Sequence, residues 1–401
     1  MLFNKGYKYR LYPTAEQATY LSRTMGCVRK VYNLLLAQSI EQYNAHKANP
    51  DTVPTPETSG YSLTKAIPAL KANPEYTYLK EAPAHALQAS ALALGQAYTN
   101  FFRRLKTSQG KPGFPRFKSR SNTGSFKLTR TDFSVKDGRL QLPKIDSTIK
   151  VKWSRQLTAN PSSVTITRTP SGKYYVCFAC EVPPTLTNGT GTVGLDFGIT
   201  NIIVTSDGEQ IPGPKSSAKY SRCLKRAQQA LSRKVKGSKN REKARLRVAK
   251  VHERTVQARK DYAEQVSRRL VNENRVLVIE ELRVANMMKN HCLAKSVQDA
   301  SFGMLAKAII RKAVESCWAS LVVADTFFPS TQLCSVCHTK AAVRVKLGVK
   351  KWTCHCGAVH DRDVNASLNL KHLGEVALEA YDLKGGSITK VDYDSYKELL
   401  V

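Results

Sequence analysis

Four of the ten cysteines of this 401-residue chain lie within 23 residues, and this cluster constrains the fold more than any other feature. The pattern is Cys334-x2-Cys337, sixteen further residues, then Cys354-x-Cys356. Two short cysteine pairs at this separation are typical of a ribbon in which four thiolates bind one structural Zn²⁺ ion. The spacer in the second pair is one residue instead of the usual two, so His338, His355 or His360 could replace a thiolate.

Another Cys-x2-Cys pair, Cys177 and Cys180, does not predict a second metal site. It lies in a segment rich in β-branched and aromatic residues, which predicts a strand. Side chains three positions apart on a strand point to opposite faces, so the two sulfurs diverge. We therefore interpret both as small core residues.

The charge of the chain predicts a polyanionic partner. It has 63 Lys+Arg against 31 Asp+Glu, a formal net charge of +32. Such a surface repels itself, and nucleic acid phosphates are the commonest groups that neutralise it. No stretch approaches the roughly 20 apolar residues of a spanning helix, and the start has no apolar signal core. We expect an intracellular protein with no membrane partner.

The densest basic block lies between residues 215 and 260, with 17 Lys/Arg against two acids. Gly237-Ser238 separates two long helical stretches within it. A charge run is usually a solvated face, but a block of one sign is better interpreted as a phosphate-contacting surface. The candidate contact residues are Arg222, Lys225, Arg226, Arg233, Lys234, Arg241 and Arg245.

A shorter basic strip over residues 111–120 alternates with aromatic residues. Its candidate contacts are Lys111, Phe114, Arg116, Phe117 and Lys118, on a backbone that two prolines stiffen. Such a strip suits a surface that follows phosphates and stacks bases. The alternative is an ordinary basic loop whose aromatic rings are tucked inward.

The pattern of apolar residues changes twice along the chain. Helical signals dominate residues 13–110: Thr14 and Gln17 have capping-box spacing, and a second helix is expected after Gly26. Short strands with turn signals over 125–183 predict a small β-barrel or sandwich. From residue 193 the pattern becomes α/β.

Three carboxylates stand where an α/β active site is expected. Asp196 follows the apolar strand Val193–Leu195, Glu280 ends the strand Val276–Ile279, and Asp363 lies where a helix begins. A carboxylate in an apolar strand costs on the order of several kcal/mol unless it is paired or binds metal. If the three converge, they can hold two Mg²⁺ ions about 4 Å apart for phosphodiester hydrolysis.

Two of these assignments have a close alternative. Glu280 continues its strand directly, whereas the neighbouring Glu281 points to the other face, so we prefer Glu280. Asp361 occupies an N-cap position. Asp363 shares a helical face with Leu370 and so faces the core, which makes it the better ligand and leaves Asp361 as the alternate.

Together these features resemble the TnpB family, transposon-encoded nucleases related to type V CRISPR effectors. The matching segments occur in order along most of the chain: Tyr9-Arg-Leu-Tyr-Pro-Thr14, Gly113-Phe-Pro-Arg-Phe-Lys118, Gly194-Leu-Asp-Phe-Gly198, Ile279-Glu-Glu-Leu-Arg-Val284, Cys334-Ser-Val-Cys337 and His360-Asp-Arg-Asp-Val-Asn-Ala366. Several are short, but their combination and order are highly specific.

The resemblance implies a multidomain α+β fold: a helical unit and a small β-barrel, then an RNase H-like (RuvC) α/β domain with a zinc-ribbon insertion. The expected boundaries are 1–12 and 121–188 for the wedge-like β-barrel, 13–120 for the helical recognition domain, 189–328 and 358–373 for the RuvC-like nuclease domain, 329–357 for the zinc ribbon, and 374–401 for a mobile C-terminal tail.

The resemblance also implies an RNA-guided, metal-dependent DNA endonuclease of a transposable element, with roles in DNA recombination. Asp196, Glu280 and Asp363 would be catalytic and bind two Mg²⁺ ions, while one structural Zn²⁺ would occupy the cysteine cluster. The implied partners are a guide RNA from the transposon end and double-stranded target DNA beside a short flanking motif. The implied location is the prokaryotic cytoplasm, at the nucleoid during use.

This chain departs from the family pattern at the zinc cluster. Only His355 separates the second cysteine pair, where the family usually has two residues, and His338 replaces a common glycine after the first pair. Both departures concern the zinc ligands and leave all three acids in place. The alternative functions are a catalytically silent RNA-guided DNA-binding repressor and a DNA transposase.

Overall fold

The computed structural model describes residues 2–107, 112–119, 123–184, 188–341 and 348–399. The chain divides into two compact units, Leu2–Val182 and Pro183–Val401, which we describe separately. In the described ranges, no helix is both long enough and apolar enough to cross a membrane.

The first unit begins with strand β1 (Phe3–Tyr12) and one long helix, α1 (Ala15–Ala48). The predicted capping box is present: Thr14 Oγ1 accepts from the Gln17 backbone N–H, and the Gln17 side chain accepts from the Thr14 N–H. We expected a new helix after Gly26, but α1 continues through it. Buried Leu21, Cys27 and Val31 lie on both sides of this glycine, so packing outweighs its low helix propensity.

Shorter helices complete the helical part of this unit. They are α2 (Gly60–Lys65), α3 (Ile67–Ala72), the 3₁₀ segment η1 (Pro74–Glu81) and α4 (Ala84–Thr107). Their buried side chains, such as Leu87 and Leu94 of α4, share one hydrophobic core with those of the strands, such as Phe126. The helical part and the sheet are therefore one compact unit, in which the boundary we expected at residue 120 does not separate two cores.

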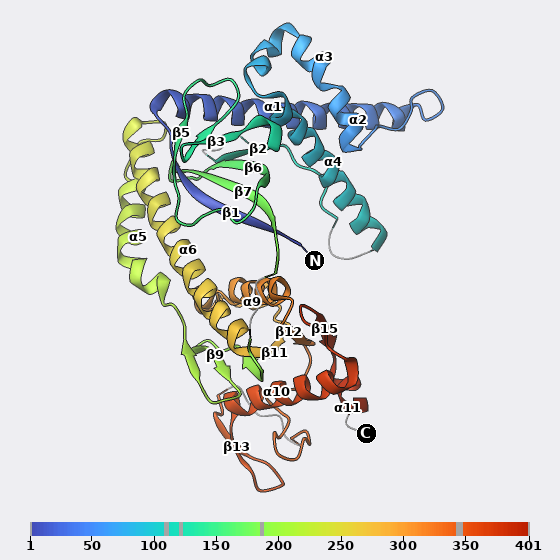
Figure 1. Ribbon diagram of the computed structural model, residues 1–401, viewed down its shortest axis with the longest axis vertical. Helices are drawn as coiled ribbons and strands as arrows, with labels where there is room; N and C mark the ends of the chain where they lie inside the picture. Colours follow the sequence, from blue (N-terminus) through green and yellow to red (C-terminus); the bar gives the residue numbers. More distant parts are fainter. Residues whose placement is uncertain (1, 108–111, 120–122, 185–187, 342–347, 400–401) are drawn as a thin grey trace. The chain divides into compact units, whose positions relative to one another are not determined.

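The sheet of the first unit has seven antiparallel strands in the order β2-β6-β7-β1-β5-β4-β3 and is strongly curled (Figure 1). Its other elements are β2 (Gly124–Thr129), η2 (Arg130–Asp132), β3 (Ser134–Lys136), β4 (Arg139–Gln141), β5 (Ile149–Lys152), β6 (Pro161–Arg168) and β7 (Tyr174–Val182). On β7, Cys180 points into the core and the half-buried Cys177 to the other face, so only Cys180 is the core residue we expected.

The second unit is built on a six-stranded sheet in the order β10-β9-β8-β11-β12-β15. Strands β8, β11, β12 and β15 are parallel neighbours, and β9 and β10 extend the sheet antiparallel. The strands are β8 (Gly191–Asp196), β9 (Asn201–Thr205), β10 (Gln210–Pro212), β11 (Asn274–Glu280), β12 (Ser320–Ala324) and β15 (Ile388–Val391).

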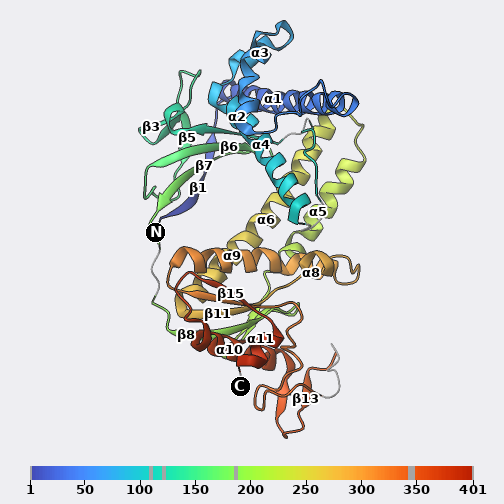
Figure 2. The same cartoon turned by 90° about the vertical axis from the view of Figure 1, so that its right-hand side faces the viewer.

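Helices cover both faces of this sheet, α9 one face and α10 the other (Figure 2). Alternate residues of β11 explain this: Leu277 and Ile279 join the core under α9, whereas Val276 and Val278 join the core under α10. The helices are α5 (Ser216–Ser232), α6 (Lys239–Glu273), α7 (Val284–Met287), α8 (Ala294–Ala300), α9 (Phe302–Ser316), α10 (Arg362–Tyr381) and α11 (Tyr393–Leu399).

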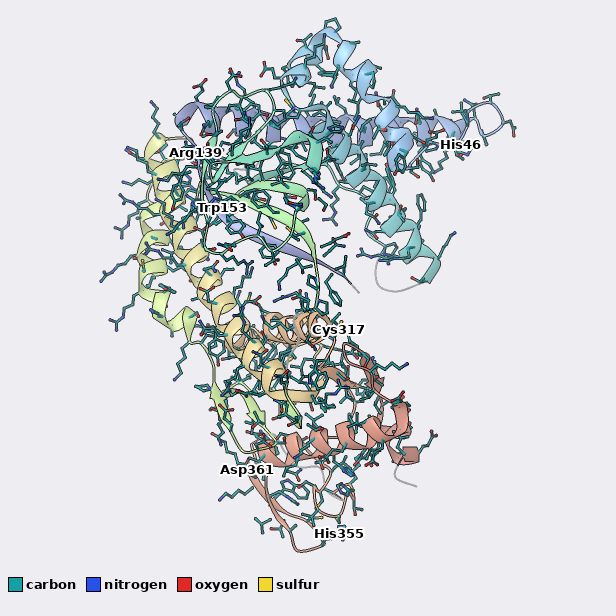
Figure 3. The ribbon with its side chains drawn as sticks, viewed as in Figure 1. His46, Arg139, Trp153, Cys317, His355 and Asp361 are labelled. Carbon is teal, nitrogen blue, oxygen red and sulfur yellow. The ribbon has the colours of Figure 1, made fainter. Side chains whose placement is uncertain are left out.

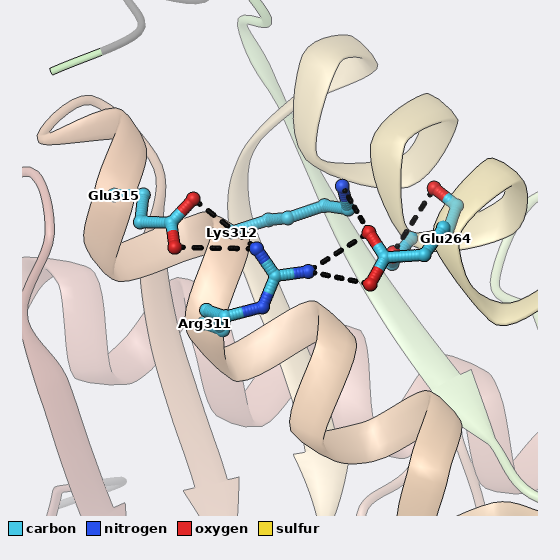
Figure 4. Close-up of polar contacts among 5 residues, drawn as sticks. Glu264, Arg311, Lys312 and Glu315 are labelled. Carbon is cyan, nitrogen blue, oxygen red and sulfur yellow. Dashed lines mark hydrogen bonds and ion pairs between the residues drawn. The ribbon is translucent and has the colours of Figure 1, made fainter. Parts of the chain in front are cut away.

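Helices α5 and α6 form a helical hairpin, and the break between them lies where Gly237-Ser238 predicts it. Ser238 caps α6, because its hydroxyl accepts from the Arg241 backbone N–H. Near its other end, α6 is tied to α9 by ion pairs of Glu264 with Arg311 and Lys312, and Arg311 also pairs with Glu315 within α9 (Figure 4).

Our expectation of a mobile tail over 374–401 is wrong for most of that segment. Helix α10 continues to Tyr381, and β15 pairs in parallel with β12 to extend the central sheet. In α11, Tyr396 is buried against Phe328. Val391 and Tyr396 of this segment are buried, and the apolar surface that they bury favours an ordered position.

Candidate active site and zinc site

Two of the predicted acids lie at the ends of adjacent parallel strands. Leu195 of β8 pairs with Ile279 of β11, and the next residue on each strand is an acid, Asp196 and Glu280. Asp196 is buried and Glu280 is half-buried. Carboxyl ends of parallel strands meet at one edge of a sheet, which is where ligand sites of α/β folds lie.

Helix α10 brings the third acid, Asp363, to this edge because the helix crosses β8 at close range. A Cβ atom on Gly194 would lie 2.0 Å from the Ser367 carbonyl oxygen and 2.5 Å from the Lys371 nitrogen. Only glycine permits this approach. The position of Asp363, in the first turn of α10, thus depends on the glycine two residues before Asp196.

Asp361, the alternate ligand, caps α10. One of its carboxylate oxygens accepts from the backbone N–H groups of Asp363 and Val364, at 3.1 and 3.2 Å. Asp363 itself is paired with its neighbour, since the Arg362 guanidinium donates to Asp363 Oδ1 at 2.9 Å. Figure 3 shows Asp361 at the start of α10.

Asp196 lies within electrostatic reach of the other two predicted acids. Burial, and then the charges of Glu280 and Asp363, hold the pKa of Asp196 well above its usual range, with Arg362 acting in the opposite direction. Burial also raises the pKa of Glu280, against a hydrogen bond from Ser330. Glu281, the rejected neighbour, points away and pairs with Lys390 at 2.7 Å.

Three residues that the sequence did not reveal hold this edge together. Ser330 donates its hydroxyl to Glu280 Oε1. The fully buried Asn369 of α10 donates to the carbonyl oxygens of Ser330 and Leu333, both at 2.8 Å. Asn365 donates to the same Leu333 oxygen at 2.7 Å and accepts from the next backbone segment. Asn365 and Asn369 are one helical turn apart and so share a helix face, and this spacing was the signal in the sequence that could have indicated their shared role.

The cysteine cluster forms a compact donor set. The sulfurs of Cys334, Cys337, Cys354 and Cys356 all lie within 4.8 Å of one another, and in the described part of the chain they are the one group of three or more Cys, His, Asp or Glu side chains gathered this closely. Thr339 hydrogen bonds lower the pKa of Cys337 to about 6, which favours the thiolate. Four convergent sulfurs fit a tetrahedral zinc ion.

The three histidines near the cluster have different surroundings. His360 Nε2 lies 3.0 Å from Cys334 Sγ, and His355 Nδ1 lies 3.4 Å from Cys354 Sγ. His338 stacks on His372 instead, with ring centroids 4.0 Å apart. Strands β13 (Lys351–Thr353) and β14 (Val359–Asp361) form the hairpin whose turn carries His355, labelled in Figure 3. All four cysteines are together, so the set needs no histidine to reach four donors.

The seven candidate contact residues of the α5–α6 hairpin divide into two groups. Five are exposed: Arg222, Lys225, Arg226, Arg233 and Lys234. The other two make contacts within the hairpin. Arg241 donates to the carbonyl oxygens of Leu231 and Lys234, and Arg245 pairs with Glu242 at 2.6 Å. The exposed group is the better candidate surface for phosphates.

The basic strip combines features of both of its interpretations. Phe114 packs edge-on against Phe101 at 5.4 Å between ring centroids, whereas Phe117 is 57% exposed. Arg116 is exposed, and the Lys118 ammonium lies 3.7 Å from the Tyr32 ring centroid. Lys111 lies outside the described residues.

Three segments of this chain match known protein families. Residues 175–291 match the family OrfB_IS605, described as "Probable transposase", and residues 302–370 match a Cas12f1-like TNB domain. Residues 1–48 match a "Helix-turn-helix domain", although the structure there is a strand and one long helix.

Two relatives match nearly the whole of this chain. A "Putative RNA-guided DNA endonuclease" of Streptomyces pristinaespiralis is 39% identical over 93% of this chain and 90% of the relative. InsQ of Escherichia coli K12, with the same description, is 28% identical over 93% of each chain. The fold resembles a chain of a Cas12f1–sgRNA–target DNA complex, with a TM-score of 0.53, 12% identity and coverage of 92% of this chain and 99% of that one. The resemblance drawn from the sequence is thus confirmed, and this chain belongs to the TnpB family.

Proposed function

We propose that this protein is an RNA-guided, metal-dependent DNA endonuclease encoded by a transposon. The observation that carries the proposal is the gathering of Asp196, Glu280 and Asp363 at one sheet edge, where burial raises the pKa values of Asp196 and Glu280 and the charges of Glu280 and Asp363 raise that of Asp196 further. Perturbed acids at the carboxyl ends of parallel strands are typical of catalytic sites. The relatives described as RNA-guided DNA endonucleases support the same reaction.

The catalytic domain is proposed to be of the RuvC, RNase H-like type. Three antiparallel strands, β10-β9-β8, continue into the parallel strands β11, β12 and β15, with helices on both faces. This arrangement supports the assignment because the acids come from the central pair of strands and from α10, which packs across them. The zinc ribbon is inserted between β12 and α10.

Asp196, Glu280 and Asp363 would hold two Mg²⁺ ions, which supply Lewis-acid activation of water and stabilisation of the leaving oxygen. Arg362 offsets only part of the negative charge of the three acids at this edge, and a divalent ion is the group that best neutralises the rest. Ser330 orients the Glu280 carboxylate, and the capped start of α10 orients Asp363. Arg362 offsets part of the negative charge on Asp363.

The guide RNA and target DNA are proposed to bind through the basic surfaces. The exposed cations of α5 and the α5–α6 turn suit the phosphates of a duplex, while Phe117 and Arg116 suit a stacked strand. In this mode the guide pairs with the target and supplies sequence specificity, while the protein reads a short flanking motif. The solved Cas12f1 complex, which contains sgRNA and target DNA, supports this pair of partners.

One structural Zn²⁺ would be held by Cys334, Cys337, Cys354 and Cys356, as the convergence of the four sulfurs supports. The ribbon is joined to the catalytic edge by a short segment, Ser330 to Cys334, which α10 holds through Asn369. Zinc would therefore stabilise the position of Ser330 beside Glu280.

The test of this proposal begins with RNA that co-purifies with the protein. Its 3′ end, once sequenced, defines a matching plasmid target, which is then incubated with the loaded protein and Mg²⁺. Cutting that requires both the RNA and the match supports the proposal. Binding without cutting indicates the silent repressor, and RNA-independent strand-transfer products indicate the transposase that the family description suggests.

A further inference from the structure

Two neighbouring phenylalanines after β12 have opposite environments. Phe328 is buried and packs edge-on against Tyr393 and Tyr396, with ring centroids 6.0 and 5.4 Å apart. Phe327, the residue before it, is 77% exposed. The buried ring anchors the loop, so the exposed ring is presented on a fixed base. An aromatic ring this exposed contributes little to folding and is accessible to a ligand outside the chain.

A cation lies beside the exposed ring. The Arg283 guanidinium lies 5.2 Å from the Phe327 ring centroid, within the range of a cation–π contact. Arg283 is itself exposed, and in the described part of the chain no carboxylate is within ion-pair distance of it. The pair therefore offers an aromatic face and a positive charge whose opposite charge the protein does not supply.

Arg283 follows β11 and Phe327 follows β12, which is the parallel neighbour of β11, so both residues come after the carboxyl ends of strands at the catalytic edge. Arg283 lies three residues after Glu280, and Phe327 lies three residues before Ser330, which donates to Glu280 Oε1. The loop that holds Phe327 is tied to the segment after β11, because Thr326 Oγ1 donates to the Glu281 carbonyl oxygen at 3.1 Å. The pair therefore belongs to the same edge as the acids.

The backbone around Phe327 is held in a defined turn. Asp325 Oδ1 accepts from the Phe327 N–H at 3.0 Å, and the other Asp325 oxygen pairs with Lys390. Lys390 also pairs with Glu281 at 2.7 Å, which joins the two loops a second time. The loop is thus pre-ordered, and binding a ligand on Phe327 requires little further loss of conformational freedom.

We propose that Phe327 and Arg283 form a subsite for one nucleotide of the single DNA strand that is being cut. The base stacks on the free face of Phe327, and the adjacent phosphate pairs with Arg283. Aromatic stacking accepts any base, which suits an enzyme whose sequence specificity comes from guide pairing. The subsite rests on the proposed function, and it adds a residue pair that positions the strand relative to the acids.

The test uses the full chain loaded with its guide RNA. We expect Phe327→Ala to slow single-turnover cutting about tenfold at saturating enzyme and to spread the cuts over neighbouring phosphates, with target binding unchanged. Phe327→Trp retains a stacking surface and should keep the wild-type rate and pattern, whereas Phe327→Leu should behave as alanine does. Arg283→Gln should slow cutting as well, and Arg283→Lys should recover part of the rate.

Tyr61→Ala is the matched control, because Tyr61 is an 81% exposed aromatic residue of the first unit. It should leave the rate and the pattern of cuts unchanged. Thermal unfolding of Phe327→Ala should match wild type, since the ring is exposed. Wild-type cutting by Phe327→Ala, or equal losses in Phe327→Trp, would overturn the subsite.

A second readout separates this subsite from the proposed function. With 2-aminopurine placed along the DNA strand, stacking on Phe327 quenches the fluorescence at one position, and Phe327→Ala should restore it whether or not the strand is cut. If wild type binds the target but never cuts, the proposed activity fails and the quench still decides the subsite. Loss of guide RNA loading in Phe327→Ala, with no change in quench, would assign the ring to RNA and contradict the proposal.

Discussion

Ser330 donates a hydrogen bond to Glu280 Oε1 across a separation of 50 residues. The contact opposes the effect of burial, which raises the pKa of Glu280. The same serine is held by Asn369 through its carbonyl oxygen, four residues before the zinc-cluster residue Cys334. One short segment therefore joins the zinc ribbon, helix α10 and a carboxylate of the proposed active site.

Ser330→Ala should move the acid limb of the pH–rate profile of cutting to higher pH. Without the hydroxyl, the Glu280 carboxylate loses a hydrogen bond that favours its charged form, so its pKa rises further. A hydrogen bond to a charged group is worth about 1.5 kcal/mol, which corresponds to roughly one pH unit. The measurement is the single-turnover rate from pH 5 to 9. Thr331→Ala, at the half-buried neighbouring position, is the control, and equal profiles would contradict the role of Ser330.

Asp196→Asn should stabilise the protein in the absence of Mg²⁺. The folded-state pKa of Asp196 is raised, so its ionisation weakens folding once the pH exceeds the unfolded value near 4, and the loss grows toward the folded pKa. At pH 7 the variant should have the higher thermal midpoint, by about 2–4 °C for each kcal/mol in a unit of this size. The difference should vanish near pH 4 and below.

The control for this prediction is the addition of Mg²⁺ to wild type and to Asp196→Asn, under conditions in which both proteins keep their zinc. The ion should raise the thermal midpoint of wild type, because it binds the folded acids, and should leave Asp196→Asn nearly unchanged. A variant less stable than wild type at pH 7 without Mg²⁺ would contradict the charge repulsion that we describe.

Gly194→Ala should disrupt the catalytic edge, because its Cβ would lie 2.0 Å from the Ser367 carbonyl oxygen. Moving α10 away from β8 costs on the order of 1–3 kcal/mol and displaces Asp363, so cutting should fall at least a hundredfold. Gly213→Ala is the matched control, since no heavy atom lies within 4 Å of its added Cβ. Thermal unfolding and cutting rates measure both variants. Equal unfolding midpoints and cutting rates in the two variants would show that the position of α10 does not depend on this contact.

Cys334→Ser should remove zinc and slow cutting together. Its sulfur lies 3.6 Å from Cys356 Sγ, and its chain neighbour Leu333 is held by Asn365 and Asn369, so the ribbon and Ser330 should loosen in the same variant. Elemental analysis should find one zinc per chain in wild type and much less in the variant. Cys292→Ser, at an exposed cysteine outside the cluster, should retain zinc. Full zinc occupancy in Cys334→Ser would contradict the assignment.

His360→Ala decides whether a histidine belongs to the zinc ligand set. The four sulfurs already gather within 4.8 Å, so we expect this variant to retain one zinc per chain. A loss of zinc as complete as in Cys334→Ser would instead make the His360 Nε2 atom, 3.0 Å from Cys334 Sγ, a ligand.

Local signals in the sequence were sufficient for much of the fold. The capping box of Thr14 and Gln17, the break at Gly237-Ser238 and the N-cap of Asp361 all form as predicted, because each depends on residues within one helical turn. The acids after apolar strands were predictable for a similar reason, since a charge that ends a buried strand has few structural uses.

Long-range contacts escaped prediction. Ser330 and Asn369 act on partners 50 and 39 residues away, respectively, so no pattern within either segment indicates the contact. The C-terminal strand β15 has strand-favouring residues but is only four residues long, and it is ordered by pairing with β12. Gly26 suggested a helix end, but packing on both sides of it decided otherwise.

Cutting of a plasmid target by wild type and Asp196→Ala, each loaded with the same guide RNA in Mg²⁺, tests the central claim most directly. The account predicts that wild type cuts only the matched target, whereas Asp196→Ala binds guide and target as tightly and leaves the DNA intact. Cutting by Asp196→Ala at the wild-type rate would contradict it.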